Sequence, residues 1–150
     1  MSTVKIFLAD EDAEMPTRAY PNDVGYDLYS TEEIEIPHGC CVTVKTGMHL
    51  VMPAGLYAQV HTRSSYGKRG LYVHNGVIDS DYTGEVSIHV MNLAGSVDEN
   101  GVIHKESYII QKGDKIAQLL FHSAERPALV ETKKLPQTDR GDKGHGSSGR

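Results

Sequence analysis

Turn-forming residues interrupt this chain so often that long helices have little room to form. Glycine, proline and Asn-Gly pairs recur at short intervals, at positions 37–39, 53–55, 75–76, 100–101 and 113–114. Proline fixes its φ angle, and glycine and asparagine tolerate positive φ, so such residues mark turns. The pair Asn75-Gly76 lies between two apolar stretches and predicts the tight turn of a β-hairpin.

The segments between these turns alternate apolar and polar residues, which is the period of a half-buried β-strand. No stretch keeps a helical apolar period for three turns, so we expect at most one short helix, at 64–68. Many short strands with this spacing predict an all-β barrel or jelly roll. The expected strands are 33–36, 41–45, 56–61 and 86–90, with a more buried strand at 116–121.

Charge and composition exclude several classes of protein. The formal net charge of −5 disfavours a protein that holds nucleic acid stably through a broad basic face. No apolar run approaches the ~18 residues that span a bilayer, and the N-terminus lacks a signal-peptide pattern. Cys40 and Cys41 are adjacent and the chain has no other cysteine, so a reducing compartment is favoured. We therefore expect a cytoplasmic protein that does not enter membranes.

The composition changes near the C-terminus. Residues 136–150 are rich in glycine and contain no aliphatic side chain. Such a segment cannot bury enough apolar surface to order itself, so we expect one domain at 1–135 and a flexible arm at 136–150. Positions 144–149 match the letters GxGxxG, but no strand precedes them and no helix can follow. A dinucleotide-binding fingerprint is therefore excluded.

Five segments stand out by their order and spacing. Each alone is a weak pattern, but five in series make a chance match very improbable. Together they closely resemble the five motifs of the trimeric deoxyuridine triphosphatase (dUTPase) family, in the family's order. They are VGYDLYS at 24–30, RSSYG at 63–67, NGVIDSDYTGE at 75–85, GDKIAQLL at 113–120 and RGDKGHGSSG at 140–149.

This resemblance implies a fold and an activity. The implied fold is a distorted, jelly-roll-like β-barrel of the β-clip type, with one short helix and a flexible C-terminal arm. The implied activity is Mg²⁺-dependent hydrolysis of dUTP to dUMP and pyrophosphate, by attack of water on the α-phosphorus. Such an enzyme keeps uracil out of DNA and supplies dUMP for dTMP synthesis.

The third motif carries the implied catalytic group. By resemblance, Asp79 accepts a proton from the attacking water, and Asp81 is left as an ordinary turn carboxylate. Tyr82 packs against the sugar, where a ribose 2′-hydroxyl would collide with it; the alternative is a tyrosine in the sheet core. We expect backbone groups near Gly76 and Ile78 to match the acceptor–donor–acceptor edge of uracil.

The first, second and fourth motifs carry the implied phosphate site. Arg63 supplies a fixed charge, and Ser64 and Ser65 lie at the start of a short helix, where an anion is favoured. Either serine could instead be an ordinary helix cap. Gln118 is a polar side chain in an apolar strand, and the resemblance places its amide against the phosphates or the attacking water. By resemblance, Asp27 holds the water shell of Mg²⁺.

The fifth motif resembles an arm that folds over bound nucleotide. Arg140 brings positive charge, Ser147 and Ser148 bring hydroxyl and N–H groups, and Gly146 lets the chain wrap the γ-phosphate. His145 occupies the position where the family usually has a phenylalanine that stacks on uracil. An imidazole also stacks, but it covers less area.

The resemblance further implies a homotrimer whose active sites gather motifs from more than one subunit. A dCTP deaminase shares the fold, but that branch has a catalytic glutamate ten residues after the hairpin aspartate, where this chain has His89. A non-enzymatic regulator on the same scaffold is the alternative of another class. A partner protein of that kind would leave no mark in the sequence.

Overall fold

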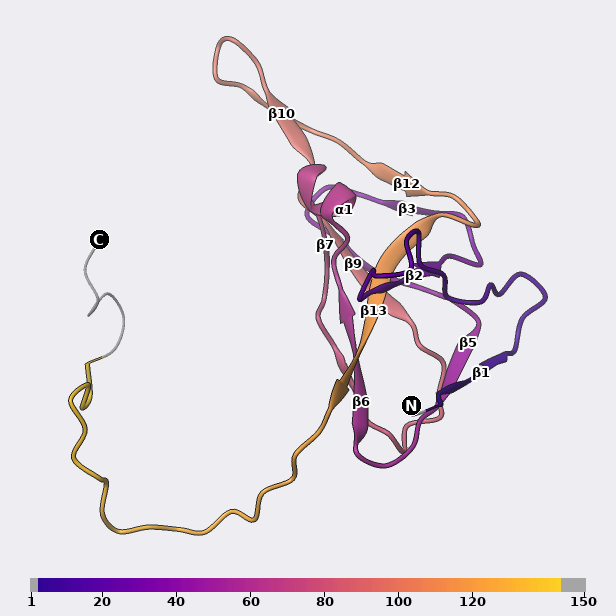
Figure 1. Cartoon of the computed structure of the whole chain (residues 1–150). Coiled ribbons are helices and arrows are strands. Elements are labelled where there is room, and N and C mark those ends of the chain that lie inside the picture. Colours follow the sequence, from indigo (N-terminus) through magenta and orange to yellow (C-terminus); the bar gives the residue numbers. More distant parts are fainter. Residues whose placement is uncertain (1–2, 144–150) are drawn as a thin grey trace.

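The computed structural model describes residues 3–143, which form short strands and one short helix (Figure 1). The helix is α1 (Ser64–Lys68). The strands are β1 (Lys5–Leu8), β2 (Tyr26–Tyr29), β3 (Ile34–Ile36), β4 (Cys41–Val44), β5 (Met48–Val51), β6 (Leu56–His61), β7 (Leu71–Val73), β8 (Val77–Ile78), β9 (Ile88–Asn92), β10 (Gly95–Val97), β11 (Ile103–Lys105), β12 (Tyr108–Ile110) and β13 (Lys115–Ser123).

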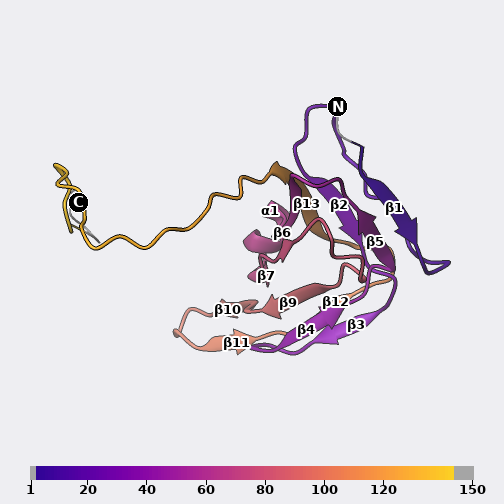
Figure 2. The same cartoon turned by 90° about the horizontal axis from the view of Figure 1, so that it is seen from below.

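The strands pair antiparallel in several small sheets. The largest sheet has the order β2-β13-β6-β8, and a second has the order β4-β9-β7. The pairs β1-β5, β3-β12 and β10-β11 complete the described sheets. Figure 2 shows β3, β4, β9 and β12 on one side of the body and β2, β6 and β13 on the other. This arrangement confirms the expected all-β, jelly-roll-like fold.

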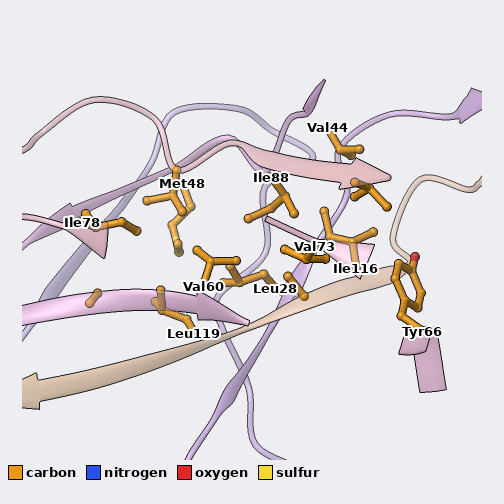
Figure 3. Packing of buried hydrophobic residues seen from close by; sticks show 14 of the residues in the cluster. Leu28, Val44, Met48, Val60, Tyr66, Val73, Ile78, Ile88, Ile116 and Leu119 are labelled. Atoms are coloured by element: carbon orange, nitrogen blue, oxygen red, sulfur yellow. The ribbon is translucent and has the colours of Figure 1, made fainter. Parts of the chain in front are cut away.

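The hydrophobic core lies between these two layers. In β6, Ala58 and Val60 are buried, while the residues between them turn to the opposite face. Burying one such aliphatic side chain fully stabilises the fold by about 1.5–3 kcal/mol, so strict alternation fixes which face of each strand turns inward. Figure 3 shows side chains from both layers pointing toward one another, among them Leu28, Val44, Val60, Val73, Ile88, Ile116 and Leu119.

Several elements fall where the sequence predicts them. The strand at 56–61 and the helix at 64–68 have the expected bounds, and β13 extends the expected strand 116–121 at both ends. The strand expected at 86–90 begins two residues later in the structure, as β9 (Ile88–Asn92). Val86 is nevertheless buried, and its N–H donates to the Met48 carbonyl at 2.8 Å instead of joining the β9 ladder.

The prediction of a hairpin turn at Asn75-Gly76 is wrong. The flanking strands β7 and β8 belong to different sheets, because β7 pairs with β9 and β8 pairs with β6. Gly76 does not have a positive φ, and neither does any non-glycine residue in the described part of the chain. The Gly76 carbonyl accepts the Val60 N–H at 3.2 Å. The segment therefore crosses from one sheet to the other.

After β13 the chain leaves the body (Figures 1 and 2). Residues 125–143 are all exposed, and Arg140 lies in this segment. The exposed stretch thus begins before position 136, where the sequence places the start of the arm. His145, Gly146, Ser147 and Ser148 lie outside the described residues. Within residues 3–143, no helix has the length and apolarity needed to cross a membrane.

A buried asparagine joins three strands around the core. The Asn92 amide group donates to the Ile36 carbonyl of β3 and to the Glu106 carbonyl before β12, both at 2.8 Å. Its side-chain oxygen accepts the Ala94 N–H at 2.8 Å. Asn92 is completely buried, so these partners would stay unsatisfied without it.

Replacement of Asn92 by alanine should lower the free energy of unfolding by about 2–4 kcal/mol, because the buried Ile36 carbonyl, the partly buried Glu106 carbonyl and one N–H group lose their partner. Denaturant unfolding at one protein concentration measures the change. The matched control is Asn100→Ala, at an exposed position in the turn between β10 and β11. Equal stability of the two variants would contradict this role of Asn92.

Candidate active site

Strand β13 brings three of the predicted residues to one cleft. Because β13 pairs with both β2 and β6, Gln118 lies opposite Asp27 on one side and His61 on the other. Arg63 follows the end of β6 by two residues. The cleft has a volume of about 440 Å³, and its lining includes Asp23, Gly25, Asp27, Arg63, Ser64, Ser65 and Gln118.

One carboxylate forms ion pairs with two cations beside this cleft. The Asp27 carboxylate accepts from Arg63 Nε at 2.8 Å and from Lys115 Nζ at 2.8 Å. The Arg63 guanidinium also donates to the Lys115 carbonyl at 3.0 Å, which fixes its plane. The hydrogen bond to Asp27 raises the pKa of Lys115. The Asp27 side chain is 15% exposed, so this pairing is only partly screened by solvent.

Lys115 is a site residue that the sequence reasoning missed. The sequence feature that could have indicated it is a lysine at the start of an apolar strand, directly after the Gly113-Asp114 turn. The strand pairing sets Lys115 opposite Tyr29 of β2, and its side chain reaches Asp27 from there. The partner could not be identified from the spacing, since 88 residues separate the two.

Gln118 is held by the backbone of the neighbouring strand. Its side-chain amide donates to the Thr62 carbonyl at 3.1 Å, immediately after β6. A Cβ added to Gly25 would lie 2.5 Å from the Gln118 side-chain oxygen. Because a Cβ atom does not approach a non-bonded oxygen this closely, glycine at position 25 is required for the observed place of the Gln118 side chain.

Ser64 and Ser65 lie at the first turn of α1, as predicted, but neither is the helix cap. Arg63 is the N-cap, with an extended backbone and no capping hydrogen bond from its side chain, although its guanidinium donates to Ser65 Oγ at 3.4 Å. The Tyr66 ring anchors α1 in the core and meets Tyr108 edge-on at 5.9 Å (Figure 3 shows Tyr66 at the end of the cluster). Burial raises the pKa of the Tyr66 hydroxyl.

The third motif lines a second cleft of about 210 Å³, together with His89 of β9. Gly76, Ile78 and Tyr82 all contribute to its wall, as the sequence predicts for residues that contact one ligand. Among the described residues, no partner is found for the Gly76 N–H. The core alternative for Tyr82 is wrong, because this residue is 48% exposed.

Tyr82 folds back over its own loop. Its hydroxyl donates to the Glu85 carbonyl at 3.1 Å. A Cβ on Gly84 would lie 2.3 Å from the Tyr82 hydroxyl oxygen, so only glycine fits beneath the ring. The Glu85 carboxylate accepts the Thr46 N–H at 3.1 Å and the Gly47 N–H at 2.9 Å. These bonds fix the loop to the connection between β4 and β5.

The structure does not bring all predicted residues together within one chain. The two clefts share no lining residue, and Asp79 lines neither of them. Asp79 is exposed, and its carbonyl accepts the Tyr82 N–H at 3.1 Å in the turn after β8. Arg140 lies in the exposed segment and makes a local hydrogen bond to the Lys143 carbonyl. Asp79, Arg140 and Arg63 thus occupy separate places.

The arginine and two serines of this cleft are donors suited to a phosphate-bearing ligand, and its two carboxylates are suited to a divalent cation. Comparison with known proteins identifies the family. The family model named dUTPase matches residues 11–149. A deoxyuridine 5'-triphosphate nucleotidohydrolase of Mycolicibacterium vanbaalenii is 36% identical over 156 residues, which cover 99% of this chain and 96% of the relative. This chain therefore belongs to the dUTPase family.

Solved structures agree with this assignment. The dUTPase of Staphylococcus bacteriophage 80alpha with dUpNHpp superposes with a TM-score of 0.87 at 28% identity, covering 99% of both chains. A variant dUTPase from phage phi11 of S. aureus superposes with a TM-score of 0.77 at 28% identity, covering 88% of this chain and 97% of the other. The phi11 structure is described as showing the coordination of a structural Mg(II) ion.

Replacement of Asp27 by asparagine should lower the free energy of unfolding by about 1–3 kcal/mol, because Arg63 and Lys115 then face each other without a counter-charge. The matched control is Asp12→Asn, since the side chains of Asp12 and Lys112 form an ion pair at the surface, 35% and 55% exposed. That control should cost less than about 1 kcal/mol. Equal losses in denaturant unfolding would contradict a special role for Asp27.

Proposed function

We propose that this chain is a dUTP diphosphatase that hydrolyses dUTP to dUMP and pyrophosphate. The observation that carries the proposal is the convergence of Asp27, Arg63 and Gln118 at one cleft through the double pairing of β13. The net charge of −5 would repel a triphosphate, so its binding has to depend on such placed groups. Membership of the dUTPase family supports the same activity.

The cleft beside α1 is the phosphate half of the proposed site. Arg63 is held by Asp27 and by the Lys115 carbonyl, so its guanidinium is positioned before ligand binds. A positioned cation costs little reorganisation when an anion arrives. Ser64 and Ser65 add hydroxyl and N–H donors at the same cleft, and the Gln118 amide lies at its wall.

The cleft of the third motif is the base and sugar half. In our proposal the backbone at Gly76 and Ile78 meets the uracil edge, and the Tyr82 ring packs on the deoxyribose. Asp79 then lies just beyond the sugar, where it accepts a proton from the water that attacks the α-phosphorus. Its exposed carboxylate is free to approach a ligand without rearrangement of the core.

Two carboxylates at the phosphate cleft fit a magnesium ion. Asp23 and Asp27 line this cleft, and carboxylate oxygen is a ligand that Mg²⁺ accepts alongside water and phosphate oxygens. In the proposed enzyme, Asp27 holds the ion through water. When bound, the ion neutralises phosphate charge in the transition state.

A homotrimer would complete the site. In one chain the Asp79 turn and the phosphate cleft are separate, so we propose that one subunit supplies the third motif and its neighbour supplies the cleft. The exposed segment 125–143 extends away from its own body with Leu129, Val130 and Leu135 at least 85% exposed, which favours a place against another copy. Cys40 and Cys41 are free and exposed, consistent with a cytoplasmic location.

In this proposal, residues 136–150 close over the nucleotide of such a shared site. Arg140, Ser147 and Ser148 would contact the phosphates, Gly146 would allow close approach, and His145 would stack on the base. Closure of such an arm excludes water and strengthens the electrostatic interactions inside the site.

Pyrophosphate release from dUTP, dCTP, dTTP, dATP and dGTP tests the activity. Wild-type chain should hydrolyse dUTP selectively, and Asp79→Asn should lose about 100-fold or more in kcat while it still binds a non-hydrolysable analogue. The matched control is Asp81→Asn, in the same exposed loop, which should keep most of the activity. Substantial turnover by Asp79→Asn would remove that residue from its role, and stable dUTP in the wild-type assay would refute the function.

Deletion of residues 139–150 should leave a folded oligomer but reduce kcat for dUTP by about 100-fold, because the site stays open to water. Size-exclusion chromatography checks the assembly, and steady-state kinetics measure the rate. His145→Phe serves as the control within the arm and should preserve or raise activity, since phenylalanine stacks over a larger area. An unchanged kcat after the deletion would contradict closure by the arm.

A further inference from the structure

Two imidazoles stand at the wall of the third-motif cleft. His89 belongs to β9 and His74 follows β7, and the two strands pair so that Val73 lies opposite Val90. The His74 N–H donates to the His89 carbonyl at 2.9 Å, and the ring centroids are 6.4 Å apart. Both side chains line the cleft beside Gly76.

Tyr82 and Glu85, two of the polar side chains of this cleft, are already engaged by the protein. The Tyr82 hydroxyl donates to the Glu85 carbonyl, and the Glu85 carboxylate accepts two backbone N–H groups. His89 differs, because one of its ring nitrogens is bound and the other remains for a ligand within the described part of the chain.

His89 is also oriented. Thr43 of β4 lies opposite His89 in the strand register, and its Oγ1 is 2.9 Å from His89 Nδ1. When the threonine hydroxyl donates to Nδ1, the neutral ring carries its proton on Nε2, which then acts as a donor. In residues 3–143, His74 has no comparable side-chain hydrogen bond, so its ring is not fixed in the same way.

We propose that His89, oriented by Thr43, selects uracil over cytosine by donating an Nε2–H hydrogen bond to the oxygen at position 4 of the base. The two bases differ along the edge formed by N3 and the 4-substituent, where uracil has a carbonyl and cytosine has an amino group. A fixed donor matches the carbonyl and opposes the amino group. The assignment rests on the proposed function, and it adds a side chain to the backbone groups at Gly76 and Ile78.

The test compares dUTP and dCTP hydrolysis in variants that keep the shape of the cleft. His89→Phe keeps a ring but removes the donor, and it should raise KM for dUTP about 10-fold with little change in kcat. The ratio of kcat/KM for dUTP over dCTP should fall at least as far. Thr43→Val removes the orienting hydroxyl at nearly constant volume and should shift the ratio in the same direction, to a smaller extent.

Two further variants separate base reading from a structural role. His89→Gln supplies an amide donor and should recover part of the dUTP preference lost in His89→Phe. His104→Phe, on β11 and outside both clefts, should change neither the KM nor the ratio. Thermal unfolding of each variant shows whether the fold is retained.

The outcomes distinguish the two claims. A wild-type chain that leaves dUTP intact would overturn the proposed function, and this inference with it. A wild-type chain that hydrolyses dUTP, while His89→Phe and Thr43→Val keep the wild-type dUTP/dCTP ratio, would overturn the inference alone. A fall in kcat for both nucleotides at constant ratio would also overturn it, because that result indicates a structural role.

Discussion

The pairing of β13 with both β2 and β6 is the constraint on which the rest of the site depends. Backbone hydrogen bonds fix its register on both sides, so Gln118 has to lie between Asp27 and the end of β6. Burial of Ala117 and Leu119 holds that register, since a shift by one residue would turn these two side chains to the outer face. Gln118 therefore faces the cleft because its neighbours in β13 pack into the core on the opposite face of the strand.

Opposite charges are paired at this cleft. Arg63 and Lys115 share Asp27 within a molecule of net charge −5. One carboxylate orients both cations, and Asp23 adds a second carboxylate to the lining of the cleft. In the proposed function, binding of a triphosphate would therefore depend on the positioned guanidinium and on a metal ion, because overall charge does not favour it.

Local patterns predicted the helix and five of the thirteen described strands, but they did not predict which strands pair with one another. Alternation and turn residues located β6, α1 and β13, because each signal lies within a few residues. The prediction of a hairpin at Asn75-Gly76 is wrong because β7 and β8 pair with other strands instead of with each other. Core packing decides which strands pair, and no local pattern contains that information. Lys115 was missed for the same reason. In the proposed trimer, the place of Asp79 relative to Arg63 would depend on contacts between subunits, which a single sequence does not define.

The central claim is that dUTP is hydrolysed at a site assembled from two subunits. Mixing two inactive variants, Asp79→Asn and Arg63→Ala, and refolding them together tests it directly. Shared sites in a trimer predict recovery of about a quarter of wild-type activity from an equal mixture, because about three quarters of the trimers are then mixed and each mixed trimer holds one intact site of its three. No recovery, with mixed trimers demonstrated by mass spectrometry, would contradict the account.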